Sequence, residues 1–139
     1  MEDYDLIPFA SAVQSGVDTV LVAHISYPNL DPDDIASMSD TIITDILRKD
    51  LGHTGIVMSD DFRMGGLKSR YSVSDAAVRF ILAGGDLILC GPRQDLQIQI
   101  MEGLTKAAED GTLSEERINE SVRRILQKKM KVSSWTPES

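Results

Sequence analysis

Apolar residues along the chain follow two spacings, and each spacing predicts one kind of element. Three short runs of mostly consecutive apolar residues, at 19–23, 55–58 and 86–90, are typical of strands that are covered on both faces. Elsewhere apolar residues recur every three or four positions, which is the spacing of an amphipathic helix. The pattern predicts helices over 6–15, over 35–51, from Ser72 or Ser74 to about residue 83, over 94–109, and after Ser114 as a cap.

The order of these elements predicts a parallel sheet. The strand centres Leu21, Val57 and Ile88 are separated by about 30 residues or slightly more, which is the length of a strand–helix–strand unit. Helical connections of this kind make consecutive strands parallel and are right-handed. The expected order is α-β-α-β-α-β-α-α. It fits an α/β fold of two kinds, a small doubly wound sheet or a segment of a (β/α)8 barrel.

The composition is that of a soluble globular domain. The chain has 139 residues, 42% of them hydrophobic, so one domain can bury a core without disulfides. Its formal net charge of −8 would repel nucleic acid and anionic membranes, and we expect neither as a partner. The single cysteine, Cys90, an acidic amino terminus and the lack of an apolar run of about 18 residues favour a cytoplasmic protein.

Polar residues follow the predicted strands at the edge where parallel sheets place their chemistry. His24 follows the first strand, and Asp60 and Asp61 follow the second. Asp60 could act as nucleophile, general base or metal ligand, or it could be an ordinary loop or cap aspartate. Since adjacent side chains of an extended segment point to opposite faces, we expect one carboxylate to face the site and the other to support the loop. His24 is either a substrate contact or a structural hydrogen-bonding group.

Other polar features have simpler explanations. His53 lies in the turn before the second strand, on the side away from the expected site, and we interpret it as structural. The pairs Gly65-Gly66 and Gly84-Gly85 lack the spacing of a dinucleotide or phosphate-binding fingerprint. The basic run over 123–131 lies toward the end of the last helix, where positive charge is favourable, and is expected to form a solvated face.

Several segments together resemble glycoside hydrolase family 3. They are residues 5–9, 22–28, 47–64, 83–89 and 117–126. The element Ser59-Asp60-Asp61 looks most like the β-N-acetylhexosaminidase branch, because the β-glucosidases commonly have Ser-Asp-Trp there. The resemblance covers nearly the whole chain, and the order of several motifs makes it more specific than any one of them.

The resemblance implies retaining hydrolysis of terminal β-linked N-acetylglucosamine, in the setting of cell-wall recycling. Asp60 matches the family's nucleophile, and a carboxylate below the anomeric carbon can form a glycosyl-enzyme intermediate without a metal or other cofactor. His24 would line the sugar pocket as a substrate-binding residue. Residues 1–131 would form the carboxy-terminal part of a TIM (β/α)8 barrel, and residues 132–139 a flexible tail.

The chain also departs from the family pattern. The family has a Lys-His pair and a Pro-Gly-His-Gly element upstream of the equivalent of Leu6, which bind sugar and supply an acid/base histidine; neither occurs here. Phe62-Arg63 stands where Leu-Ser or Leu-Gly is more usual. Three strands are far short of eight. We therefore expect a partial glycosidase that is inactive alone, and whose open sheet edges pair with a second copy or with a complementary amino-terminal half-barrel.

Two other function classes remain open on the sequence. One is a non-catalytic remnant or self-associating α/β module of the same ancestry. The other is a phosphoacceptor domain that uses Asp60 and Asp61 with Mg²⁺. The lack of a third acidic strand end and of a well-placed lysine counts against the second.

Overall fold

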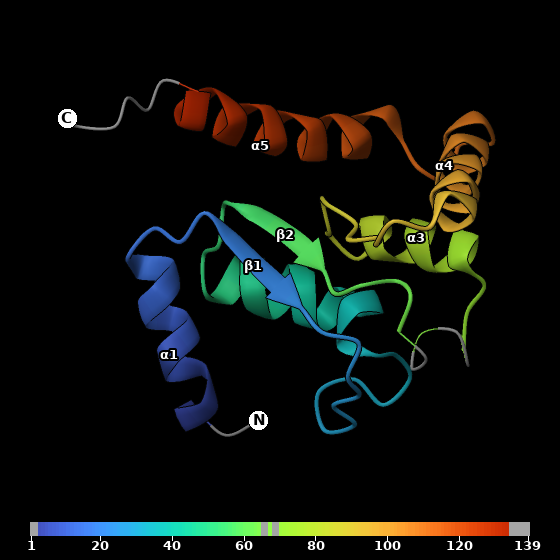
Figure 1. Ribbon diagram of the computed structural model, residues 1–139. Coiled ribbons are helices and arrows are strands. Elements are labelled where there is room, and N and C mark those ends of the chain that lie inside the picture. Colours follow the sequence, from blue (N-terminus) through green and yellow to red (C-terminus); the bar gives the residue numbers. More distant parts are fainter. Residues whose placement is uncertain (1–2, 65–66, 68–69, 134–139) are drawn as a thin grey trace.

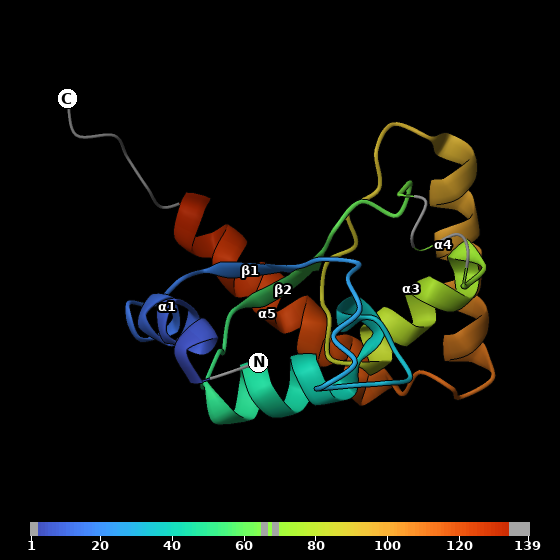
Figure 2. The ribbon, with the colours of Figure 1, turned by 90° about the horizontal axis from the view of Figure 1, so that it is seen from below.

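The computed structural model describes residues 3–64, 67 and 70–133 (Figure 1). Its elements, in chain order, are α1 (Asp3–Gln14), β1 (Thr19–Val22), η1 (Ala36–Met38), η2 (Thr41–Asp50), β2 (Ile56–Ser59), α3 (Val73–Leu82), α4 (Gln94–Glu109) and α5 (Glu115–Ser133). Figures 1 and 2 both place α1 at one end of the molecule and the pair α3 and α4 at the other. Of the tail expected from residue 132, Val132 and Ser133 belong to α5, and 134–139 lie outside the described residues.

The sheet at the centre of the molecule is parallel, as the order of elements predicts. β1 and β2 pair with Val20 opposite Val57 and Val22 opposite Ser59. The predicted third strand lies beside β2 but joins it through a single parallel bridge, between Met58 and Leu87. The described residues therefore form two regular strands and one irregular neighbouring segment.

Two hydrogen bonds explain why the segment 86–90 is not a regular strand. The amides of Asp86 and Leu87 both donate to the Val57 carbonyl, at 2.9 and 3.1 Å. In a regular ladder each of these amides would have its own carbonyl acceptor. The amide of Leu89 then donates to the side-chain oxygen of Ser59, at 3.0 Å. A side chain thus replaces a backbone acceptor, and the ladder is interrupted.

The predicted helix over 35–51 is divided in two. η1 is a short 3₁₀ turn, and η2 is a helix of π type, with the Leu51 amide donating to the Ile46 carbonyl at 2.9 Å. Between them, Ser39 Oγ accepts from the Ile42 amide and Asp40 Oδ1 accepts from the Thr41 amide. These side chains supply acceptors for the first amides of η2, so a new helix begins there.

The remaining helices begin and end close to where the sequence predicts. Ser72, and not Ser74, caps α3, because its Oγ accepts from the Asp75 amide at 3.1 Å. Ser74 instead donates to the Gln99 carbonyl of α4. Ser114 Oγ accepts from the Arg117 amide at the start of α5. No helix in the described ranges is long and apolar enough to cross a membrane.

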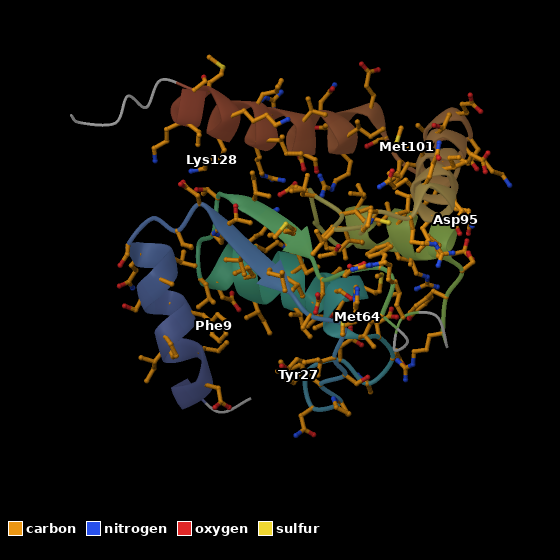
Figure 3. The ribbon with its side chains drawn as sticks, viewed as in Figure 1. Phe9, Tyr27, Met64, Asp95, Met101 and Lys128 are labelled. Carbon is orange, nitrogen blue, oxygen red and sulfur yellow. The ribbon has the colours of Figure 1, made fainter. Side chains whose placement is uncertain are left out.

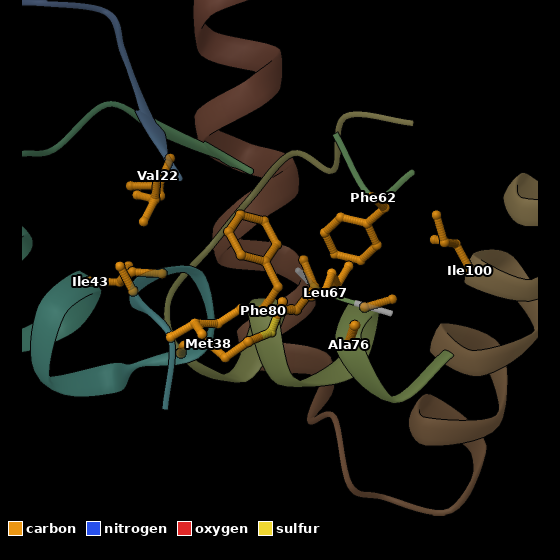
Figure 4. Packing of buried hydrophobic residues seen from close by; sticks show 14 of the residues in the cluster. Val22, Met38, Ile43, Phe62, Leu67, Ala76, Phe80 and Ile100 are labelled. Atoms are coloured by element: carbon orange, nitrogen blue, oxygen red, sulfur yellow. The ribbon is translucent and has the colours of Figure 1, made fainter. Parts of the chain in front are cut away.

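The core lies between the sheet and the helices η2 and α3. Phe62 and Phe80 are fully buried and pack edge to face with 6.4 Å between ring centres (Figure 4). Gly85 allows this packing, since a Cβ atom there would lie 2.2 Å from Cζ of Phe80. Ile43 and Val57 complete the contact between η2 and the sheet.

A buried ion cluster holds the amino-terminal end of the sheet. The carboxylate of Asp86 accepts from Arg48 at 2.7 Å, from Arg124 at 2.9 Å and from the Ser121 hydroxyl at 2.7 Å. Lys128 of α5, which is labelled in Figure 3, pairs with Asp18, just before β1. The prediction of a solvated basic face is therefore wrong for Arg124 and Lys128, which tie α5 to the amino-terminal end of the sheet.

Candidate functional site

Asp60 is held at the carboxyl end of β2 by the backbone of the sheet. Its amide donates to the Val22 carbonyl at 3.0 Å, which continues the pairing of β1 and β2 by one residue. Ser59, directly before it, is fully buried and bonded to the neighbouring segment. The position of the Asp60 backbone is thus fixed by two adjacent parallel segments.

The carboxylate of Asp60 has little else bound to it. Its Oδ1 accepts from the amide of Asp61 at 2.8 Å. No lysine or arginine among the described residues forms an ion pair with it, and the residue is partly exposed. A carboxylate that a strand end holds in place can attack an electron-poor carbon or accept a proton.

The carboxylate of Asp61, unlike that of Asp60, is paired with an arginine. Arg63 donates to its carboxylate from the side chain, with Nη2 at 2.5 Å and Nε at 2.7 Å, and from the backbone amide at 2.9 Å. This arginine lowers the pKa of Asp61 to about 2. Gly91 leaves room for Arg63, since a Cβ atom there would lie 2.3 Å from Cζ of Arg63. Asp61 therefore supports the loop, which is one of the two roles expected for this pair of carboxylates.

His24 lies beyond the end of β1 and faces the loop after β2. Its Nδ1 is hydrogen-bonded to Ser37 Oγ at 2.7 Å, and its ring packs edge to face on Phe62 with 5.5 Å between centres. Burial lowers the pKa of His24, while the charge of Asp60 opposes that shift. The structure thus brings His24 and Asp60 to one edge of the sheet. The predicted contact of His24 with a sugar stays a prediction.

His53 lies at the opposite end of β2 from Asp60. This position agrees with the interpretation of His53 as a structural residue. Its side chain is buried, and Nε2 donates to the Ile56 carbonyl at 3.1 Å. Burial lowers the pKa of His53. It cannot serve a reaction at Asp60, because β2 lies between them.

The surface has two grooves whose walls include neither Asp60 nor His24. One, of about 990 Å³, lies between α3 and α4 and includes Tyr71, Arg79 and Lys106. The other, of about 210 Å³, is mostly apolar and is formed by α1, β1 and η2. Neither is lined by the predicted site residues, so the walls of a sugar pocket around Asp60 are not formed by either groove.

The arrangement does not favour a magnesium site. No group of three His, Cys, Asp or Glu residues in the described part of the chain could hold a metal ion. Asp61, the second carboxylate of that hypothesis, is occupied by Arg63. The phosphoacceptor alternative therefore lacks its ligands among these residues.

The structure adds residues that the sequence did not indicate. Ser37 contacts His24 from 13 positions away, and no local pattern marks it. Arg63 was noted only as a departure from the family pattern, although the short i, i+2 spacing to Asp61 allows this ion pair. Ser59 was visible as part of the Ser-Asp-Asp element, but its bond to Leu89 depends on the tertiary structure.

A parallel α/β layout with a carboxylate at the carboxyl end of a strand defines a class of α/β domain with a candidate nucleophile at that edge of the sheet. Comparison with known proteins identifies the family. Residues 1–128 match the model of the glycosyl hydrolase family 3 N-terminal domain, and the chain belongs to that family.

The relatives place the chain in the hexosaminidase branch. The β-hexosaminidase of Xylella fastidiosa strain 9a5c is 39% identical over 93 residues, which cover 66% of this chain and 28% of that protein. The solved family 3 β-N-acetylglucosaminidase of Paenibacillus sp. FPU-7 is 36% identical with a TM-score of 0.90, over 97% of this chain and 26% of that one. The β-N-acetylglucosaminidase of Thermotoga maritima is 34% identical with a TM-score of 0.82, over 88% and 27%. The chain thus spans between a quarter and a third of these relatives.

Proposed function

We propose that this chain is the nucleophile-bearing part of a retaining glycosidase that removes terminal β-linked N-acetylglucosamine. The observation that carries the proposal is the carboxylate of Asp60, held by the sheet within a Ser-Asp-Asp element and without an ion pair to any lysine or arginine that the structure describes. The solved relatives described as β-N-acetylglucosaminidases support the choice of sugar. The proposed setting is the recycling of cell-wall saccharides in a reducing cytoplasm, which the free thiol of Cys90 favours.

The reaction has two steps. A carboxylate oxygen of Asp60 forms a bond to the anomeric carbon while the bond to the leaving oxygen breaks, and that oxygen takes a proton from a general acid. Water then attacks the anomeric carbon, loses a proton to the same group, and releases Asp60 as a carboxylate. Both steps invert the anomeric centre, so the product retains its configuration.

The general acid is the component that the described residues do not offer. His24 has Nδ1 bonded to Ser37 and Nε2 enclosed, and His53 lies beyond the opposite end of β2. We therefore propose that the acid comes from outside this stretch of chain, and that the stretch alone does not turn over substrate.

An exposed apolar face supports the further proposal that a complementary half-barrel covers the sheet. Leu21 lies opposite Met58, which lies opposite Leu87, so these side chains share one face. Leu21 and Leu87 are 46% and 40% exposed, which is unusual for neighbouring residues of a parallel sheet. Both of these relatives are more than twice as long as this chain, and their length supplies the argument for the occupant, namely further strands of the same barrel. Pairing between two copies of this chain is the competing outcome.

The test measures hydrolysis of an aryl β-N-acetylglucosaminide by this chain, alone and mixed with the preceding half-barrel of a family relative. We expect activity only in the mixture, and its loss by at least about a thousandfold with Asp60→Asn, since a nucleophile is removed. Asp33→Asn, a change at an exposed carboxylate outside the site, is the matched control. An active mixture containing Asp60→Asn would overturn the nucleophile assignment, and a mixture that associates without activity would favour the non-catalytic module.

A further inference from the structure

The edge of β1 that faces away from β2 has unused hydrogen-bonding groups. The Val22 carbonyl accepts from the Asp60 amide at 3.0 Å, so the backbone groups of Val22 face β2. Because alternate residues of a strand direct their backbone groups to the same edge, Thr19 and Leu21 direct theirs to the other edge. Within the described ranges nothing bonds to the amides or carbonyls of these two residues. Such an edge is a template for another strand.

An apolar groove lies along this open edge, between α1, β1 and η2. It has a volume of about 210 Å³, and its walls include Leu6 and Phe9 of α1, Leu21 of β1 and Ile46 of η2, but no residue of β2. Figure 1 shows α1 and β2 on opposite sides of β1. Phe9, which is labelled in Figure 3, is 52% exposed. The groove thus offers space for apolar side chains directly beside the unused backbone groups of β1.

The helix α1 covers less of the sheet than its place in the fold allows. No side chain over 5–14 is buried, although Leu6, Ala10 and Val13 share one face of the helix and are half-buried. In a parallel sheet, a helix that leads into a strand packs across that strand and its neighbour in a right-handed connection. The described residues include no strand on the open side of β1. The groove lies where such a neighbour would pack under α1.

We propose that the open edge of β1 pairs with a parallel strand from a complementary part of a family 3 barrel, and that an apolar side chain of that strand fills the groove. Thr19 and Leu21 then supply the main-chain bonds, and the groove selects a strand with an apolar residue in the matching register. This contact is at the edge of the sheet, whereas Leu21 and Leu87 belong to its open face. The identity of the partner rests on the proposed function, because the matched relatives are more than twice as long as this chain.

Backbone hydrogen exchange tests the pairing of the edge. It is measured on the whole chain, alone and with the preceding half-barrel of the Thermotoga maritima relative, at a concentration where light scattering shows single chains. In the chain alone, we expect the amides of Thr19 and Leu21 to exchange at least about tenfold faster than the Val20 amide, which belongs to the ladder with β2. In the mixture, they should slow by at least about tenfold. Equal exchange of the three amides in the chain alone, or no slowing in the mixture, would overturn the proposal.

Two substitutions in α1 test the groove. Phe9→Asp should weaken binding of the half-barrel by at least about tenfold, because a carboxylate would be enclosed among apolar side chains. Ile7→Asp is the matched control, since Ile7 is 57% exposed on the same helix and does not line the groove. It should change binding by less than about twofold. Circular dichroism of both variants checks that α1 stays helical. Equal losses of binding in the two variants would refute the role of the groove.

A second copy of this chain is the competing occupant of the edge. If rising concentration of the chain alone slowed the Thr19 and Leu21 amides as strongly as the half-barrel does, the second copy would be the occupant and the proposal would be wrong. None of these readouts needs turnover. A bound but inactive mixture would contradict the proposed function and leave this inference standing, whereas an active mixture with unprotected edge amides would do the reverse.

Discussion

Arg48 and Asp86 form an ion pair that joins η2 to the start of the segment beside β2. Nη2 of Arg48 lies 2.7 Å from Oδ2 of Asp86, and the side chain of Asp86 is completely enclosed. The same carboxylate accepts from the Val57 amide and from Arg124 of α5. One side chain therefore connects a helix, both neighbouring segments of the sheet and the last helix.

Replacing Asp86 should be among the most damaging single changes in the chain. In Asp86→Ala the guanidinium groups of Arg48 and Arg124 lose their buried partner, and we expect the free energy of unfolding to fall by about 3–5 kcal/mol. Urea unfolding followed by circular dichroism measures this loss. Asp33→Ala, at an exposed position, should change the stability by less than about 0.5 kcal/mol. Equal effects of the two substitutions would contradict the role of the cluster.

Arg63 should control the titration of Asp61. The pKa of Asp61 is about 2 because Arg63 donates to its carboxylate, so Arg63→Met should raise that pKa toward 3.8. The stability that this pair contributes is complete above the unfolded pKa and is lost as the pH falls through about 2. Carbon-13 detection of the carboxyl group measures the midpoint. A midpoint unchanged by Arg63→Met would show that another group holds it down.

The two histidines should make the fold less stable at mildly acidic pH. Burial lowers the pKa of both His24 and His53, so below about pH 6.5 the unfolded chain binds protons that the folded chain does not. The free energy of unfolding should therefore decrease as the pH falls from 7 toward 5. Urea unfolding across this range tests the sign, and His24→Gln should reduce the slope.

Gly85 should not tolerate a side chain. A Cβ atom there would lie 2.2 Å from Cζ of the buried Phe80, so Gly85→Ala forces the ring or the backbone to move. We expect a loss of about 1–3 kcal/mol, typical of overpacking. Because the clash is with the phenyl ring, Phe80→Leu should lower the free energy of unfolding less in the Gly85→Ala background than in the unaltered chain. Additive losses in this double-mutant cycle would place the strain elsewhere.

The exposed face of the sheet should determine whether the chain associates with itself. Light scattering at increasing concentration should show association, and Leu21→Lys should reduce it because a charge replaces an apolar side chain at the open edge. Met130→Lys, at an exposed position of α5, is the control and should leave the association unchanged. A monomer at all concentrations would contradict self-association while leaving open pairing with a complementary half-barrel.

Local signals in the sequence account for much of the fold. The bounds of α4 were predicted correctly, because Gly91 and Pro92 end the preceding segment and the apolar spacing continues without a break to Glu109. The parallel pairing of β1 with β2 followed from the length of the connection between them. The division of 35–51 was missed, since Ser39 and Asp40 can occur inside a helix as well as begin one.

Contacts between distant residues account for what the sequence could not show. The side chain of Ser59 replaces a backbone acceptor for Leu89, which no strand pattern reveals. Asp60 could be located because a strand end is a local feature, but the bond from Ser37 to His24 needs the loop to fold back. The partners of Asp86 lie more than 25 residues away on either side and were equally invisible.

The ion cluster at Asp86 and the carboxylate of Asp60 lie at opposite ends of the parallel segments. The buried ion pairs gather at the amino ends, where α5 and η2 are joined, whereas the candidate chemistry occupies the carboxyl ends. The carboxylate of Asp60 can therefore be replaced without disturbing these ion pairs. A lineage of such chains could change its substrate, or abandon catalysis, and still inherit the same architecture.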